Sequence, residues 1–139
     1  MNQLNDIKIR SKSDFERASQ IIELGFPTVE PLLPHLFEWI QDMNWPVAKR
    51  VAPFLVSIGR PMFPALNDIL AGADLSWQYW CISDVIGKLP KELASDYRTL
   101  LERIAYSPTD LEKHHELSVV ALDAVRSFGW ARSDPDNTG

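Results

Sequence analysis

Two short stretches of glycine, proline and apolar residues constrain the fold of this chain more than any other feature. The first covers residues 25–36 (Gly-Phe-Pro-Thr-Val-Glu-Pro-Leu-Leu-Pro-His-Leu), and a thinner copy covers residues 59–66 (Gly-Arg-Pro-Met-Phe-Pro-Ala-Leu). In each, an apolar helix ends at a glycine, the chain turns at a proline, and a second apolar helix begins. The glycines, Gly25 and Gly59, are 34 residues apart. A period of this size, with one helix pair per unit, is typical of an α-solenoid.

Size and charge narrow the class of protein. A chain of 139 residues is long enough for one domain that buries about 70 % of the surface of its unfolded chain. Its 14 basic and 19 acidic residues give a net charge of −5, so its average field repels phosphate backbones and anionic membranes. We therefore expect neither a nucleic-acid nor a membrane partner. The sequence shows no signal peptide and no membrane span, which predicts a cytoplasmic location.

The apolar pattern predicts an all-α fold, a short α-solenoid of seven helices arranged as three antiparallel pairs plus a terminal helix. The expected helices cover residues 14–24, 29–41, 45–58, 61–71, 77–89, 91–106 and 110–128. They form one domain over residues 13–129. Residues 1–12 are expected to form an extended N-terminal arm. Residues 130–139 have nothing to bury and are expected to form a disordered tail.

Two of these helices carry a well-defined apolar arc when residues are spaced at about 100°. In helix 29–41 the arc contains Val29, Leu32, Leu33, Leu36, Phe37 and Ile40. Trp39 lies at its edge and is expected to be half-buried. In helix 77–89 the arc contains Cys81, the single cysteine. A lone cysteine excludes an internal disulfide, and its apolar setting predicts a buried and inert thiol.

Helix starts are marked by capping patterns. Residues 13–16 (Ser-Asp-Phe-Glu) and 109–112 (Thr-Asp-Leu-Glu) read as capping boxes, with Ser13 and Thr109 as N-caps. A third pattern that can begin a helix occurs twice. Residues 42–45 (Asp-Met-Asn-Trp) are matched, 32 residues later, by residues 74–77 (Asp-Leu-Ser-Trp). This repeat predicts Asn44 and Ser76 as N-caps of the following helices.

This order of turns and apolar positions over residues 13–106 resembles HEAT-like repeats. Leu24 and Gly25 lead to a helix with Val29, Pro31 and Leu32, as the Leu-Gly turn of such repeats leads to a Val-x-Pro-Leu-x-x-x-Leu helix. More narrowly, residues 42–48 (Asp-Met-Asn-Trp-Pro-Val-Ala) and 74–80 (Asp-Leu-Ser-Trp-Gln-Tyr-Trp) look like a group of small bacterial proteins with a domain of unknown function. That resemblance implies no activity.

Several kinds of chemistry are excluded by spacing. The six glycines are never closer than ten residues apart, which leaves no glycine-rich phosphate loop. One Glu-x-x-His pair, Glu112 and His115, could offer two metal ligands, but a di-iron bundle needs a second such motif. We therefore expect no metal, no cofactor and no catalytic residues.

The tryptophans and their neighbouring carboxylates remain as candidate binding residues. We expect them to form or border one patch at an end of the helix stack, where aromatic anchors and carboxylates would suit a ligand bearing lysine or arginine. The candidates are Asp42, Asn44, Trp45, Asp74, Trp77, Trp80 and Asp84. The alternative is that the tryptophans only pack between repeats, and that Asp84 is a surface residue paired with Lys88.

The leading hypothesis is a non-enzymatic module that binds a protein or peptide, with a basic partner favoured by the negative charge. The rival hypothesis is an enzyme, because some HEAT-like proteins are DNA glycosylases that hold a damaged base against tryptophans beside a catalytic aspartate. Trp80 and Asp84 resemble that pair. The acidic composition and the absence of a basic cluster in the sequence oppose this hypothesis. Neither the identity of the partner nor the oligomeric state follows from the sequence.

Overall fold

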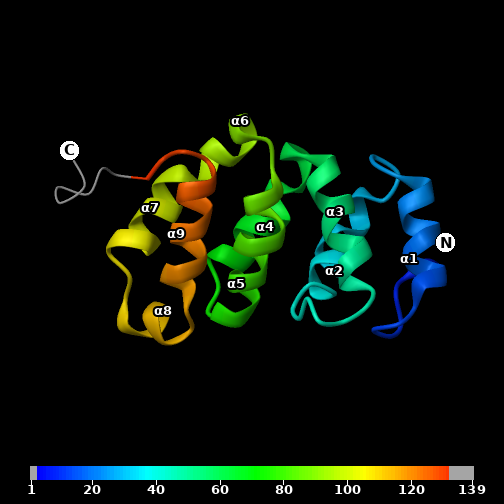
Figure 1. Ribbon diagram of the computed structural model, residues 1–139. Helices are drawn as coiled ribbons and strands as arrows, with labels where there is room; N and C mark the ends of the chain where they lie inside the picture. The colour runs from blue at the N-terminus through cyan, green and yellow to red at the C-terminus, as the bar shows by residue number, and fades with distance from the viewer. Residues whose placement is uncertain (1–2, 132–139) are drawn as a thin grey trace.

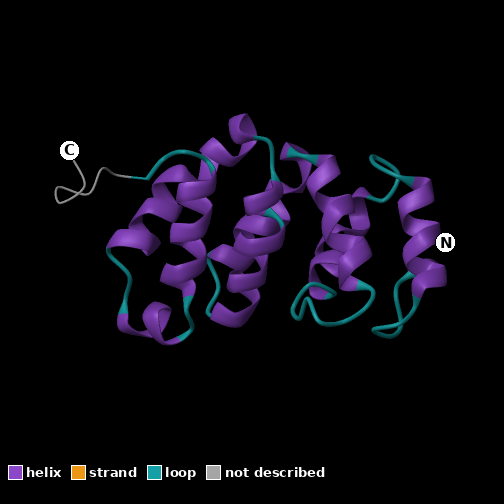
Figure 2. Ribbon diagram, in the orientation of Figure 1, coloured by secondary structure: helices purple, strands orange, loops and turns teal. Residues whose placement is uncertain are grey.

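The fold is all-helical, as predicted. The computed structural model describes residues 3–131, and this part contains helices and loops but no strand (Figures 1 and 2). The α-helices are α1 (Phe15–Leu24), α2 (Leu33–Glu38), α3 (Ala48–Ile58), α4 (Phe63–Leu70), α5 (Leu75–Asp84), α6 (Lys91–Ala94), α7 (Arg98–Tyr106), α8 (Asp110–His114) and α9 (Leu117–Ser127). Short 3-10 helices are η1 (Gln3–Ile7), η2 (Glu30–Leu32), η3 (Arg60–Met62), η4 (Ile86–Lys88) and η5 (Ser95–Tyr97).

The helices lie side by side in a row that runs from the N-terminus to the C-terminus (Figure 1). Contacts join α3 to both α1 and α2, and α4 to both α2 and α5. The last helix, α9, packs against α7, α5 and α8. The predicted terminal helix, which corresponds to α8 and α9, is therefore not left unpaired, because α7 packs along α9.

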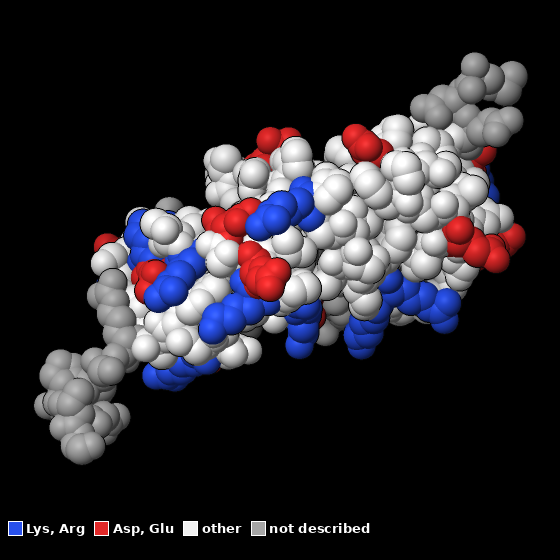
Figure 3. Space-filling model, turned by 90° about the horizontal axis from the view of Figure 1, so that it is seen from above, with Lys and Arg blue, Asp and Glu red and all other residues white. Residues whose placement is uncertain are grey.

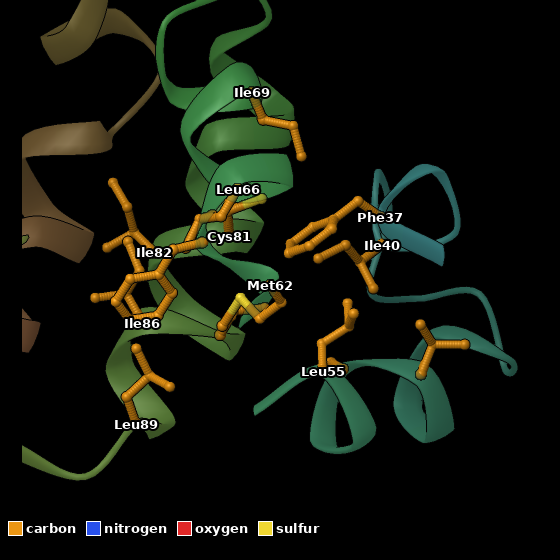
Figure 4. Packing of buried hydrophobic residues seen from close by; sticks show 14 of the residues in the cluster. Phe37, Ile40, Leu55, Met62, Leu66, Ile69, Cys81, Ile82, Ile86 and Leu89 are labelled. Carbon is orange, nitrogen blue, oxygen red and sulfur yellow. The ribbon is translucent and has the colours of Figure 1, made fainter. Parts of the chain in front are cut away.

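The core runs through the row of helices. Figure 4 shows side chains from α2, α3, α4 and α5 meeting in its centre, among them Phe37, Leu55 and Leu66. All six residues of the arc predicted for 29–41 are buried, and Trp39 is half-buried, which confirms this prediction. Cys81 is fully buried, as expected.

Several helices are shorter than the sequence pattern predicts. The helix expected at 77–89 ends at Asp84 and continues as η4 after Val85, whose φ of −113° departs from the helical value. The helix expected at 91–106 is divided into α6, η5 and α7. The helix expected at 110–128 is interrupted by Glu116, which has a left-handed backbone with φ 61°. An apolar period continues across such breaks, so the pattern alone does not reveal them.

Three of the four predicted helix N-caps are wrong and one is confirmed. The Asp14 side chain, instead of Ser13, caps α1 by accepting a hydrogen bond from the Arg17 amide. Asp74, instead of Ser76, caps α5 by accepting one from the Trp77 amide. A carboxylate is the better acceptor near a helix N-terminus because its charge opposes the helix dipole. The capping box of Thr109 is formed as predicted.

The N-terminus of α3 also differs from the prediction. The N-cap of α3 is Val47 and the helix starts at Ala48, so Asn44 caps no helix. Asp42 instead accepts a hydrogen bond from the Asn44 amide at 2.8 Å, which closes a turn before the helix.

Both ends of the predicted domain lie closer to the core than expected. Residues 3–7 form the 3-10 helix η1 instead of an extended arm, and Ile9 is buried. The Lys12 carbonyl accepts a hydrogen bond from the Val47 amide. Trp130, expected in the tail, is 6 % exposed and packs on Phe128. Residues 132–139 of the expected tail lie outside the described residues.

His35 holds the N-terminal segment in place. Its Nε2 atom accepts a hydrogen bond from the Ile9 amide at 2.9 Å, which only the neutral ring can do. Burial lowers the pKa of His35 from its ordinary value of 6.5, Glu38 opposes this shift and Lys8 adds to it. Because the folded state favours the neutral ring, this contribution to stability is complete above about pH 6.5 and is lost as the pH falls below it.

We predict that His35→Phe removes much of this dependence on pH and costs about 1 kcal/mol at neutral pH, the value of one hydrogen bond. Urea unfolding of the variant and the parent protein at a series of pH values between about 8 and 5 measures both effects, since histidine titrates in that range. His114→Phe is the control, because His114 is exposed. An unchanged pH profile in His35→Phe would contradict this role.

Candidate functional site

An open pocket of about 290 Å³ lies between α2, α4 and the start of α5. We call it the α2–α4 pocket. It is lined by Pro34, Phe37, Glu38, Ala65, Asp68, Ile69, Gly72, Ala73, Asp74 and Trp77. The apolar residues Phe37 and Ile69 are buried, and Trp77 is half-buried, whereas the acidic residues are exposed. The pocket therefore has an apolar floor and an acidic rim.

Helix geometry explains which side chains face the pocket. Residues spaced i, i+3 and i+4 share one face of a helix. The residues from α2 have this spacing and are Pro34, Phe37 and Glu38. The residues from α4 have the same spacing and are Ala65, Asp68 and Ile69. The two helices pack against each other, so these faces adjoin at the pocket.

Trp77 is held in place at the edge of the pocket by two hydrogen bonds. Its indole Nε1 donates to the Phe37 carbonyl at 2.9 Å, and its amide donates to Asp74 Oδ1 at 3.0 Å. The first bond joins α5 to α2, which are distant in sequence. The aromatic wall of the pocket is thus fixed before any ligand arrives, and a fixed wall lowers the entropic cost of binding.

Gln78 fixes the loop that closes the pocket. This side chain is only 5 % exposed, and its Nε2 donates to the carbonyls of Ile69 and Gly72 at 3.2 and 2.9 Å. Both amide hydrogens are therefore used, and the end of α4 is joined to α5. Because the loop of residues 71–74 supplies part of the rim, Gln78 also positions Asp74.

The rim carries uncompensated negative charge. Glu38, Asp68 and Asp74 are exposed, and within residues 3–131 none of them forms an ion pair. No lysine or arginine lines the pocket. Three carboxylates around an apolar depression create a local field that attracts cations. Basic side chains gather instead along one long edge of the molecule, the lower edge in Figure 3.

Cys81 is buried and does not line this pocket. Burial raises the pKa of the Cys81 thiol well above its ordinary range, and the negative charge of Asp74 raises it further. The thiol therefore stays protonated at neutral pH and is not nucleophilic.

The structure brings together only two of the seven residues selected from the sequence, Asp74 and Trp77. Asp42 and Asn44 form the turn before α3, and Trp45 packs edge-on against Trp39 with ring centroids 5.6 Å apart.

The last two selected residues also lie apart. Trp80 lines a second hollow with Tyr79, and Asp84 lines a third with Lys49 and Lys88. Trp80 and Asp84 therefore do not line one common pocket, although they are one turn apart on α5.

Sequence reasoning missed the acidic residues of α2 and α4. Neither Glu38 nor Asp68 is among the residues selected from the sequence. A signal was nevertheless present, because each acid stands four residues after the proline at the start of its helix, Pro34 in α2 and Pro64 in α4. The two acids have the same position relative to these prolines on two helices that pack against each other, which is how both carboxylates reach one pocket.

Metal binding finds no support in residues 3–131, which contain no group of three histidine, cysteine or acidic side chains suited to a metal ion. Glu112 of the Glu-x-x-His pair accepts hydrogen bonds from Arg103 and Thr109 instead. In the same part of the chain, no helix combines the length and the apolar character needed to cross a bilayer.

These observations define a class, an all-helical domain of short packed helices with a preformed, acidic and apolar pocket on its surface. The chain belongs to the family described as Domain of unknown function (DUF5071), whose model matches residues 9–125. This match agrees with the narrower of the two resemblances seen in the sequence. No curated protein matches the chain significantly.

Proposed function

We propose that this protein is a non-enzymatic binding module of the HEAT-like α-solenoid type, which binds a basic and apolar segment of a partner protein in the α2–α4 pocket. Contacts between α1 and α3 and between α2 and α4 support the solenoid, because stacked repeats join alternate helices in this way. The observation that carries the proposal is the acidic rim around an apolar floor, with no cation beside it within residues 3–131.

The chemistry of the pocket selects its ligand. A lysine or arginine side chain has an aliphatic stem and a charged head. The stem would lie against Trp77 and Ile69, and the head would reach the carboxylates of the rim. A neighbouring apolar residue of the partner would fill the remaining floor. Because the rim charges are exposed, they contribute to the association rate and to specificity more than to packing energy.

Binding to labelled peptides, measured by fluorescence anisotropy, tests this proposal. We predict that peptides in which lysine or arginine alternates with leucine bind, whereas matched peptides with glutamate do not. The double variant Glu38→Gln/Asp68→Asn is expected to lower the affinity about tenfold. These two positions are chosen because Asp74 also caps α5.

The matched control is Asp110→Asn/Asp123→Asn, which removes two exposed carboxylates outside the pocket. It changes the net charge by the same amount, so it is expected to weaken binding much less. Equal losses in both double variants would show that total charge attracts the peptides, and would refute binding in the pocket. Failure of basic peptides to bind better than acidic ones would refute the proposed partner.

A further inference from the structure

A second hollow of about 340 Å³ lies between the first turns of α5 and the junction of α8 with α9. Ser76, Tyr79 and Trp80 line it from α5, and His115 and Glu116 line it from the junction. None of these residues lines the α2–α4 pocket. Trp80, one of the residues selected from the sequence, therefore lies at this hollow and not at the α2–α4 pocket.

Two aromatic rings form perpendicular walls of this hollow. The rings of Tyr79 and Trp80 have centroids 5.0 Å apart and planes at 88°. Both side chains are half-buried, so parts of their faces remain accessible. Aromatic faces carry negative charge density, and rings set at an angle can surround a methylated ammonium group on adjacent sides.

Glu116 supplies the charge, at a strained position. Its φ of 61° makes it the only residue other than glycine with positive φ in residues 3–131. A left-handed backbone costs a residue with a Cβ atom free energy that glycine does not lose. The Glu116 side chain is exposed, and within residues 3–131 it forms no ion pair that would favour glutamate at this position. The turn from α8 to α9 uses this backbone, since the Glu116 amide donates to the Lys113 carbonyl and the Glu116 carbonyl accepts from the Val119 amide. Glycine would form the same turn at a lower cost, so a carboxylate at this position points to a use of its charge.

We propose that this hollow binds a methylated ammonium group, with Tyr79 and Trp80 contacting the methyl groups and the Glu116 carboxylate opposing the charge. Methylation favours such a ligand over a bare ammonium because it spreads the charge over an apolar surface that the rings can cover. No lysine or arginine lines the hollow to repel it. The group could belong to a free choline-type molecule or to a methylated lysine. This site is independent of the α2–α4 pocket.

Titration of the protein with choline, followed by NMR of ¹⁵N-labelled tryptophan indoles, tests the proposal. The comparison ligand is the neutral analogue in which carbon replaces the choline nitrogen. At about pH 8, where histidine is neutral, choline is expected to shift the Trp80 resonance and to bind at least about tenfold more tightly than the analogue. Equal binding of both compounds, or no shift with choline, would overturn the proposal.

Variants assign the effect to the hollow. Trp80→Leu removes one wall, and Glu116→Gln removes the charge at an exposed position that the fold does not need. Both are expected to abolish the preference for choline, whereas Asp110→Asn, on α8 outside the hollow, is expected to retain it. Circular dichroism checks that Trp80→Leu is folded, and Glu116→Gln decides the question if it is not. A preference that survives Glu116→Gln would overturn the assignment of the charge.

Glu116→Gly separates function from stability. Glycine relaxes the strained backbone, so this variant is expected to have a higher Tm and yet a weaker affinity for choline. A peptide with trimethyl-lysine and its unmodified copy then distinguish the two sources. Tighter binding of the methylated peptide than of choline indicates a protein ligand, and equal binding indicates a free one. Both outcomes require that the methylated peptide binds more tightly than its unmodified copy.

Discussion

Replacing Leu66 with alanine is expected to lower the free energy of unfolding by about 3 kcal/mol. Leu66 is fully buried on α4, and Figure 4 shows it beside Cys81 and near Phe37 and Met62, which belong to other elements. The substitution removes apolar contacts and leaves a cavity, because neighbours on several helices cannot all move into the space. The loss is large because α4 contacts both α2 and α5.

Urea unfolding at neutral pH measures this loss. The matched control is Leu111→Ala, since Leu111 is also on a helix but is 65 % exposed. The change in helix propensity is similar at both positions, so the difference between them reports burial. The control is expected to stay within about 0.5 kcal/mol of the parent protein. Similar losses in the two variants would show that α4 does not lie in the core as described.

Replacing Glu112 with glutamine is expected to lower the free energy of unfolding by about 2 kcal/mol at neutral pH. The expected loss is not larger because solvent partly screens the charge of Arg103. Glu112 is 7 % exposed and receives two hydrogen bonds from the Arg103 guanidinium, at 2.8 and 2.7 Å. It also accepts one from the Thr109 amide at 2.8 Å. Glutamine lacks the charge and one acceptor oxygen, so it leaves part of this network unpaired.

The Glu112 carboxylate also makes the free energy of unfolding depend on pH in the acid range. Hydrogen bonding to Arg103 is the largest cause that lowers the pKa of Glu112, from 4.5 to about 2, although burial opposes the shift. Because the folded pKa lies below the ordinary value, the stabilisation is complete above about pH 4.5. It is lost as the pH falls from there towards 2.

Urea unfolding of Glu112→Gln and the parent protein is therefore expected to differ at neutral pH and to converge in acid. The control, Glu102→Gln, removes a carboxylate that forms an ion pair with Arg98 four residues away on the same helix. Such surface pairs contribute at most about 0.5 kcal/mol. A difference between Glu112→Gln and the parent that stays constant with pH would contradict the ion-pair role.

Local rules allowed much of the fold to be predicted from the sequence. The helical class follows from apolar periodicity, and the turns follow from residues such as Gly25 and Gly59, which have φ of 71° and 78°. The capping box at Thr109 needs only residues three positions apart. Interactions of this range are encoded in short stretches. The choice of capping residue is less well encoded, because Asp14 and Asp74 cap α1 and α5 instead of Ser13 and Ser76.

The candidate site could be predicted only in part. The Asp-x-x-Trp pattern selected Asp74 and Trp77 correctly as neighbours, because they are three positions apart on one turn. It also selected the equivalent Asp42 and Trp45, which lie outside the pocket. Equal local sequence cannot distinguish these two pairs. The difference arises from the neighbouring helices, because Trp77 meets the Phe37 carbonyl whereas Trp45 meets the Trp39 ring.

The sequence by itself thus determined the helices, their apolar faces and the turns between them, since these depend on residues a few positions apart. Only the tertiary structure decided which polar faces adjoin. It placed Glu38 of α2 beside Asp68 of α4, and it imposed on Glu116 a backbone that its own preference opposes. Packing between helices distant in sequence fixes such features, because it outweighs the small local preferences of single residues.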